Sequence, residues 1–306
     1  MTSHYHKQKE WFQEMGQWQG SVIPAILPKM LLCVSFSVLV VFLDQRGLNL
    51  AIPVRSGLIP SILLGLLLVF RTNTAYDRFW EGRKIWGTLI NTVRNLARGI
   101  WVTVIESTPQ DREVKKQVLQ LLIAFAIAMK LHLRREPINQ ELASLMPIAL
   151  YQQLQTAHNP PLAIAFWISD YLQQQQHQQK INVYQLNAAF KLLDTMVDCL
   201  GAAERILKTP IPAAYAIHLK QLVFVYCLTL PFELVDQVVW LTPLLVGLVS
   251  FAIFGIEEIG AEIENPFGYD ANDLPLDQIC QTMKKNIDDL TQFSTSQDMT
   301  RSLLRR

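Results

Sequence analysis

The sequence predicts an all-α, polytopic membrane protein that combines four transmembrane helices with a cytoplasmic helical bundle. Half of its 306 residues are hydrophobic and 17 % are charged, a larger apolar share than one soluble core requires. Residues 238–256 form a run without a charged side chain that is long enough to cross a bilayer. Nowhere do β-branched and polar residues alternate convincingly over several positions, so no strand is expected.

The four expected spans differ in how clearly their residues mark them. Residues 22–43 are apolar except for Lys29, whose alkyl chain can carry the ammonium group toward a headgroup. Residues 57–70 are also apolar, but this run is short enough to be a buried soluble helix. Residues 215–234 hold ionisable groups near both ends, and residues 238–256 are the clearest span.

The remaining segments, residues 71–214 and 257–306, are expected to form the cytoplasmic helical region of a single unit, residues 1–306. Apolar residues recur there at spacings of three and four, as in amphipathic helices. The uncharged run at residues 117–129 is too short for a span and predicts a buried bundle helix. Several basic residues follow the second span and favour a cytoplasmic position for both termini: Arg78, Arg83, Lys84, Arg94 and Arg98. Residues 1–20 lack the apolar core of a signal peptide, so no cleaved signal is expected.

The residues offer little to an enzyme or to a bound cofactor. The sequence contains no phosphate-binding glycine loop, no GxSxG, no HExxH and no CxxC pair. The only paired acids at the edge of a span are Glu233 and Asp236, and an interfacial role suits them better than catalysis. A net charge of +1 does not indicate a nucleic-acid partner. We therefore expect a protein without catalytic residues, without a cofactor and without a nucleic-acid ligand.

An unusual density of charged and aromatic residues follows the second span, in the segment RTNTAYDRFWEGRKIWG at residues 71–87. An interfacial belt of aromatic and basic residues would explain it equally well. Read together with residues 59–70, with WQGS at 18–21 and with IENPFGYDANDLPLD at 263–277, however, the chain resembles prokaryotic and plastid members of the bestrophin family. The residues that carry the signature are Arg71, Asp77, Arg78, Phe79 and Trp80.

The resemblance implies a homopentamer around one central pore. By position, the narrow neck of that pore would be lined by Ile62, Leu66 and Phe70. Residues four apart lie on one face of a helix, so one helix could present all three. Without the resemblance, an apolar stripe of this kind is more often lipid-facing or core. A second constriction, at the cytoplasmic end, is expected near Ile181 and Tyr184.

Animal members of the family hold calcium in an acidic clasp that follows an NPFG sequence, and this chain matches only its beginning. Asn265 stands in the NPFG sequence, and Asp270 and Asp273 follow, but Tyr269 occupies a position where a carboxylate is expected. Calcium prefers six to eight oxygen ligands that include several carboxylates. We therefore expect no metal here, and instead expect Asp270 or Asp273 to cap the next helix.

The resemblance implies a passive channel that conducts small monovalent anions such as chloride, with membrane lipid and the permeating ions as its partners. One alternative is a channel of the same fold that selects monovalent cations, because residues 57–70 contain no charge that decides between them. Another is a membrane scaffold that conducts nothing. The bacterial plasma membrane is the expected location, with the thylakoid membrane as the alternative.

Overall fold

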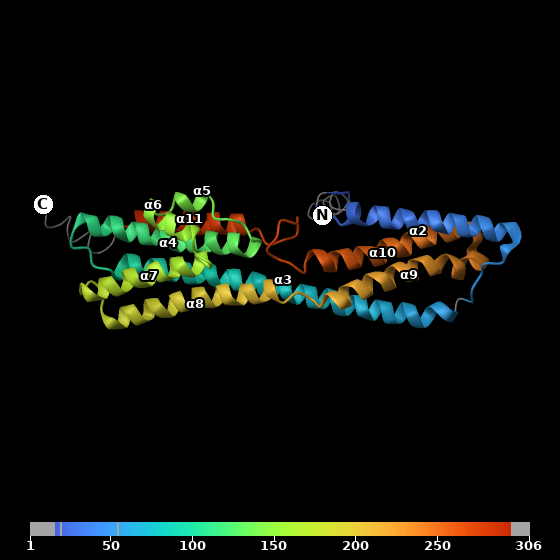
Figure 1. The fold of residues 1–306 in the computed structure, drawn as a ribbon, viewed down its shortest axis with the longest axis horizontal. Coiled ribbons are helices and arrows are strands. Elements are labelled where there is room, and N and C mark those ends of the chain that lie inside the picture. The colour runs from blue at the N-terminus through green and yellow to red at the C-terminus, as the bar shows by residue number, and fades with distance from the viewer. Residues whose placement is uncertain (1–15, 19, 54, 295–306) are drawn as a thin grey trace, which may run out of the picture. The chain divides into compact units, whose positions relative to one another are not determined.

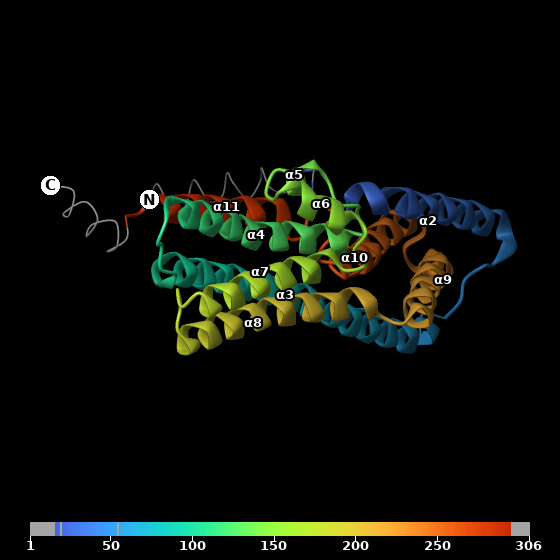
Figure 2. The same cartoon turned by 60° about the vertical axis from the view of Figure 1, so that its left-hand side comes forward.

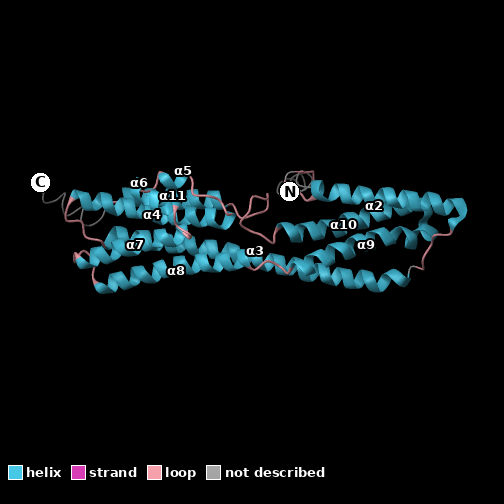
Figure 3. Ribbon diagram, viewed as in Figure 1, coloured by secondary structure: helices cyan, strands magenta, loops and turns pink. Residues whose placement is uncertain are grey.

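Every regular element in the described part of the chain is a helix, as Figures 1 and 3 show. The structure is a computed structural model, and it describes residues 16–18, 20–53 and 55–294. In chain order the elements are α2 (Ile23–Leu43), η1 (Asp44–Leu48), α3 (Arg55–Thr103), α4 (Pro109–Arg134), α5 (Gln140–Ala143), α6 (Ile148–Gln155), α7 (Pro160–His177), α8 (Val183–Lys208), α9 (Ala213–Val238), η2 (Val239–Leu241), α10 (Thr242–Glu262) and α11 (Leu276–Gln292). The prediction of an all-helical chain is confirmed for these residues.

The chain divides into two compact units. The first unit comprises the described residues of Met1–Trp80 together with Pro210–Asp273. The second comprises Glu81–Thr209 together with the described residues of Leu274–Arg306. Helix α3 contributes its first half to one unit and its second half to the other.

The first unit is built from α2, α9, α10 and the beginning of α3. Helix α10 packs against both α2 and α9, and α2 also packs against α9, which Figures 1 and 2 show from two directions. Apolar side chains from all four helices form its core: Ile26, Cys33, Leu64, Leu68, Leu219, Val223, Cys227, Leu230, Val246 and Phe254. The cysteines therefore behave as small apolar residues here.

Among the described residues, four stretches are apolar and long enough to cross a membrane: Ile23–Leu48, Ile59–Thr103, Pro109–Arg134 and Ala213–Glu262. The last of these contains two helices, α9 and α10, which the short turn η2 separates. The first, second and fourth bury only 22–28 % of their most apolar window inside the protein, as helices that face lipid or another subunit would.

Helix α4, which is the third apolar stretch, differs from the other three in its burial. It buries 78 % of its window, because it packs against α7 and α11 in the second unit. A capping box defines its beginning: Thr108 accepts the N–H of Asp111, and the Asp111 carboxylate accepts the N–H of Thr108 at 2.9 Å. We therefore retain the expectation that the run at residues 117–129 belongs to a buried bundle helix, although its composition alone would permit a span.

The second expected span, residues 57–70, is only the beginning of a much longer helix. Helix α3 has 49 residues and continues through the charged signature to Thr103. The sequence between residues 61 and 103 contains no proline, and its charged residues are compatible with helix. A change from apolar to charged composition therefore marks a change of environment along α3 rather than the end of a helix.

Candidate functional site

The three residues predicted to line the neck point away from the core of the first unit. Ile62, Leu66 and Phe70 are 51–65 % exposed, whereas Leu64 and Leu68 on the same helix are buried in the core. This division follows from helix geometry, because residues four apart share a face and residues two apart do not. The apolar stripe at 62, 66 and 70 is therefore available to meet a pore, lipid or another subunit.

The five signature residues divide into inward and outward groups. Arg71 is buried, and the Arg78 Nε donates a hydrogen bond to the Glu264 carbonyl at 3.0 Å. Asp77 and Trp80 are exposed. The two arginines are seven residues apart and lie on one face of α3, which packs on the end of α10. The signature is thus more than an interfacial belt, because two of its five residues hold α3 against the residues at the end of α10.

The residues expected at the cytoplasmic constriction lie in the second unit and face different environments. Ile181 is buried and lines a cavity with Leu96 and Leu172. Tyr184, at the beginning of α8, is strongly exposed. Of the two, only Tyr184 presents its side chain at the protein surface.

The acidic segment after α10 is a closed turn. The Asp273 carboxylate accepts the N–H of Asp270 at 2.8 Å, and a Cβ on Gly268 would stand 2.7 Å from the same carboxylate oxygen. Among the described residues, no group of three or more His, Cys, Asp or Glu side chains could hold a metal ion. In this turn Asp273 therefore holds the backbone of Asp270, and Tyr269 supplies no carboxylate.

The expectation that Asp270 or Asp273 caps the following helix is wrong. Helix α11 begins at Leu276, and the N-cap position is Pro275, which provides no side-chain acceptor. The two aspartates stand too early in the chain, because Pro275 in the LPLD sequence delays the beginning of the helix.

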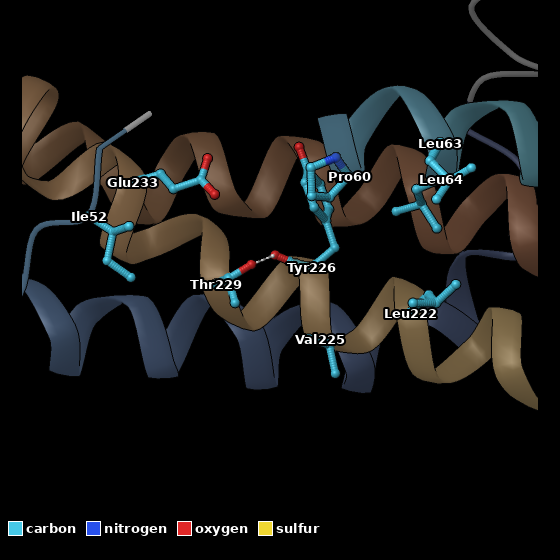
Figure 4. A pocket seen from close by; sticks show the side chains of 9 residues that line it. All are labelled: Ile52, Pro60, Leu63, Leu64, Leu222, Val225, Tyr226, Thr229 and Glu233. Carbon is cyan, nitrogen blue, oxygen red and sulfur yellow. Dashed lines mark hydrogen bonds between the residues drawn. The ribbon is translucent and has the colours of Figure 1, made fainter. Parts of the chain in front are cut away.

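A cavity of about 350 Å³ lies in the first unit between the beginning of α3, α9 and the segment that contains Ile52, as Figure 4 shows. Its lining is mostly apolar, with the Glu233 carboxylate at one end and Leu222 toward the other. The Thr229 hydroxyl donates to the Tyr226 carbonyl at 3.0 Å, so it serves the helix. Asp236 does not line this cavity.

Helix α3 presents basic side chains at the surface of the second unit. Arg83, Lys84, Arg94 and Arg98 are exposed, and none of the four forms an ion pair with a carboxylate in the described residues. No acidic residue occurs on α3 after Glu81, which pairs with Arg205 at 2.6 Å. The sequence showed these arginines and lysine only as an orientation signal, and their placement on one exposed helix is what makes them candidates for attracting anions.

The partners of Arg71 are the functional candidates that the sequence did not reveal. They are Glu257 and Glu264, at the end of α10, and through Glu257 also Lys220 of α9. One signal in the sequence was available: Glu257 follows a long uncharged run, and a charge at such a position needs a partner. Only the fold shows that this partner is Arg71.

Comparison with known proteins identifies the family. The family described as "Bacterial/Fungal Bestrophin protein" matches residues 2–289. The chain is 59 % identical over 283 residues to a voltage-dependent anion channel-forming protein of Synechocystis sp., with 92 % of each chain covered. It is also 59 % identical to a protein of that name from Nostoc sp., over 94 % of this chain and 93 % of the other.

Solved structures agree with the sequence comparisons. A bacterial bestrophin homologue from Klebsiella pneumoniae superimposes with a TM-score of 0.82 at 28 % identity, covering 87 % of this chain and 98 % of the other. The expectation of a protein that is not an enzyme agrees with this relationship. The apolar helices of the first unit are those of an integral membrane protein. The chain belongs to the bestrophin family.

Proposed function

We propose that this chain is a subunit of a passive channel for small monovalent anions such as chloride. The observation that carries the proposal is its 59 % identity, over more than nine-tenths of its length, to two cyanobacterial proteins named as voltage-dependent anion channel-forming proteins. Because the similarity extends over the whole described fold, we transfer the activity of the whole relatives to the whole chain.

The exposed stripe of Ile62, Leu66 and Phe70 is the proposed neck, in a homopentamer whose five α3 helices surround one pore. Each of these side chains is more than half exposed in the single subunit. An apolar constriction gates by dewetting and offers no charged partner to replace the water around an ion. Large, weakly hydrated anions such as thiocyanate should therefore pass more readily than chloride.

Preference for anions is supported by the exposed basic residues of α3. Arg83, Lys84, Arg94 and Arg98 are unopposed by any carboxylate on the same helix after Glu81. Repeated in several subunits, such side chains would raise the local anion concentration in an aqueous vestibule. At the proposed cytoplasmic constriction, Tyr184 is the residue available to face the pore, with the buried Ile181 supporting the beginning of α8.

The proposed location is the bacterial plasma membrane, with the thylakoid membrane as the alternative, and both termini are proposed to be cytoplasmic. The basic residues that follow the apolar half of α3 support this orientation through the positive-inside rule.

Recording from the purified protein in planar bilayers tests the channel and its neck together. We expect chloride currents from the wild type, and larger currents when Ile62, Leu66 and Phe70 are all changed to Ala, because smaller side chains widen the constriction and weaken dewetting. Leu63→Ala is the matched control, since Leu63 is exposed on α3 but does not belong to the stripe of Ile62, Leu66 and Phe70. Absence of current from wild type and triple variant alike would favour a non-conducting scaffold instead.

A further inference from the structure

Four ionisable side chains gather in the first unit directly beside the proposed neck. The Arg71 Nη1 lies 3.2 Å from the Glu257 Oε1, and its Nη2 lies 3.8 Å from the Glu264 Oε2. The Lys220 Nζ lies 4.0 Å from the same Glu257 oxygen. Two positive and two negative groups from α3, α9 and the end of α10 thus form a neutral cluster.

The centre of this cluster is deeply buried and poorly hydrogen-bonded. Arg71 and Glu257 have side-chain exposures of 2 % and 3 %. Within the described residues, the Nε and Nη1 of Arg71 and the Oε1 of Glu257 are buried and make no hydrogen bond. A buried ion pair with unsatisfied atoms recovers its desolvation cost incompletely, and apolar residues of similar size would stabilise the fold as well or better. Stability alone therefore does not explain why charges occupy these positions.

The position of the pair along α3 suggests what it does instead. Arg71 follows Phe70 immediately, and successive helical residues point about 100° apart. Holding Arg71 against α10 therefore turns Phe70 away from α10 and toward the exposed face. Seven residues further along the same face, Arg78 binds the Glu264 carbonyl at 3.0 Å. Glu257 of α10 and Glu264, two residues beyond the end of α10, thus hold α3 at two positions after the proposed neck.

We propose that the Arg71–Glu257 pair fixes the rotation of α3 about its axis and thereby positions Phe70 at the neck. Arg71 and Glu257 are positioning residues, since neither carries the exposed stripe itself. This inference rests on the proposed function, in which the stripe at Ile62, Leu66 and Phe70 lines the pore. It adds that movement of the end of α10 changes the neck.

Bilayer recordings can separate positioning from simple support of the fold. Arg71→Met combined with Glu257→Leu replaces the buried pair with apolar side chains of similar size, so the melting temperature of this double variant should remain within a few degrees of the wild type. Its open probability should nevertheless change at least threefold, because nothing then selects one rotation of α3. If the pair only supported the fold, the open probability would instead stay unchanged in every variant that folds.

The chain supplies a matched control one residue along α10. Glu258 pairs with Lys29 of α2 at 2.6 Å, but both side chains are partly exposed. Glu258→Gln removes one carboxylate, as Glu257→Gln does, yet it leaves the contact with α3 intact. We expect Glu257→Gln to change the open probability at least threefold and Glu258→Gln to leave it unchanged. Equal effects of the two substitutions would overturn the proposal.

A second measurement decides the question without any current. In a Phe70→Cys protein, a charged methanethiosulfonate reagent reports the accessibility of position 70, while the native cysteines in the described residues are buried. Adding Glu257→Gln should change the modification rate at least fivefold, and adding Glu258→Gln should not. An unchanged rate with Glu257→Gln would refute the positioning role. Absence of wild-type current with a changed rate would count against the proposed channel function alone.

Discussion

The loss of one buried cation should loosen the end of the longest helix. Lys115 of α4 places its Nζ 2.8 Å from the Glu106 Oε1 and donates a hydrogen bond to the Trp101 carbonyl at 3.1 Å. Both charged side chains are 1 % exposed. Trp101 is one of the last four residues of α3, and the backbone carbonyls of these residues find no N–H donor within the helix. Lys115 therefore neutralises Glu106 and caps α3 at the same time.

The expected magnitude follows from this burial. Lys115→Met leaves the buried Glu106 carboxylate without its nearest cation, while the Arg112 Nη1 still lies 3.8 Å from the Glu106 Oε2. Breaking a buried ion pair costs about 3–5 kcal/mol, and the remaining Arg112 places the expected cost at the lower end, about 3 kcal/mol. Replacing both partners, with Lys115→Met and Glu106→Leu, removes the buried carboxylate as well. The double variant should therefore lose less stability than Lys115→Met alone.

The neighbouring Lys116 gives a matched control on the same helix. Its Nζ lies 3.9 Å from the Glu113 Oε2, and both side chains are well exposed. A surface pair of this kind contributes about 0–1 kcal/mol, so Lys116→Met should be nearly silent.

Amide hydrogen exchange, read by mass spectrometry on peptides that cover residues 96–118, measures the local free energy of opening. A loss of about 3 kcal/mol accelerates exchange by roughly two powers of ten, at about 1.4 kcal/mol for each factor of ten. Lys115→Met should show this acceleration and Lys116→Met should not. If the two variants exchange within threefold of each other, the reasoning about the buried pair is wrong.

Three further outcomes are expected. The Lys130 ammonium lies 2.8 Å from the Asp277 carboxylate and holds the pKa of that carboxyl below its usual range. The carboxylate therefore stabilises the fold above pH ~4 and loses that contribution as the pH falls through the folded-state pKa. The difference in melting temperature between wild type and Asp277→Asn should shrink between pH 7 and pH 3, and a constant difference would contradict this. Gly268→Ala should lower the melting temperature, at a cost of about 1–3 kcal/mol, because its Cβ would stand 2.7 Å from the carboxylate oxygen that holds the turn; an unchanged melting temperature would show that the turn relaxes freely. Arg94→Gln with Arg98→Gln should move the reversal potential in a potassium chloride gradient toward zero, and no shift would remove these residues from the selectivity argument.

The fold class and the membrane character could be predicted because each rests on local composition. The uncharged run at residues 238–256 lies within η2 and α10 apart from its first residue, which ends α9. The length of α3 could not be predicted in the same way, because the charged Arg71 directly after an apolar run does not show whether the helix ends there or continues. Its charge is tolerated inside a continuous helix because Glu257, 186 positions later, neutralises it, and such long-range pairing is not visible in local composition.

The candidate site shows the same division. Spacing placed Ile62, Leu66 and Phe70 on one face, and the structure shows that face exposed in the single subunit. Spacing did not distinguish Ile181 from Tyr184, since both stand near the beginning of α8, and burial separates them only when α7 and α3 pack beside that helix. The expected cap at Asp270 or Asp273 was wrong because Pro275 shifts the beginning of α11.

The reversal potential of the wild-type current under a tenfold potassium chloride gradient tests the central proposal most directly. For one monovalent ion, a tenfold gradient corresponds to about 59 mV at 25 °C. An anion channel should reverse close to the chloride equilibrium potential. Reversal close to the potassium equilibrium potential, of equal size and opposite sign, would contradict the account and assign this bestrophin to the cation-conducting alternative.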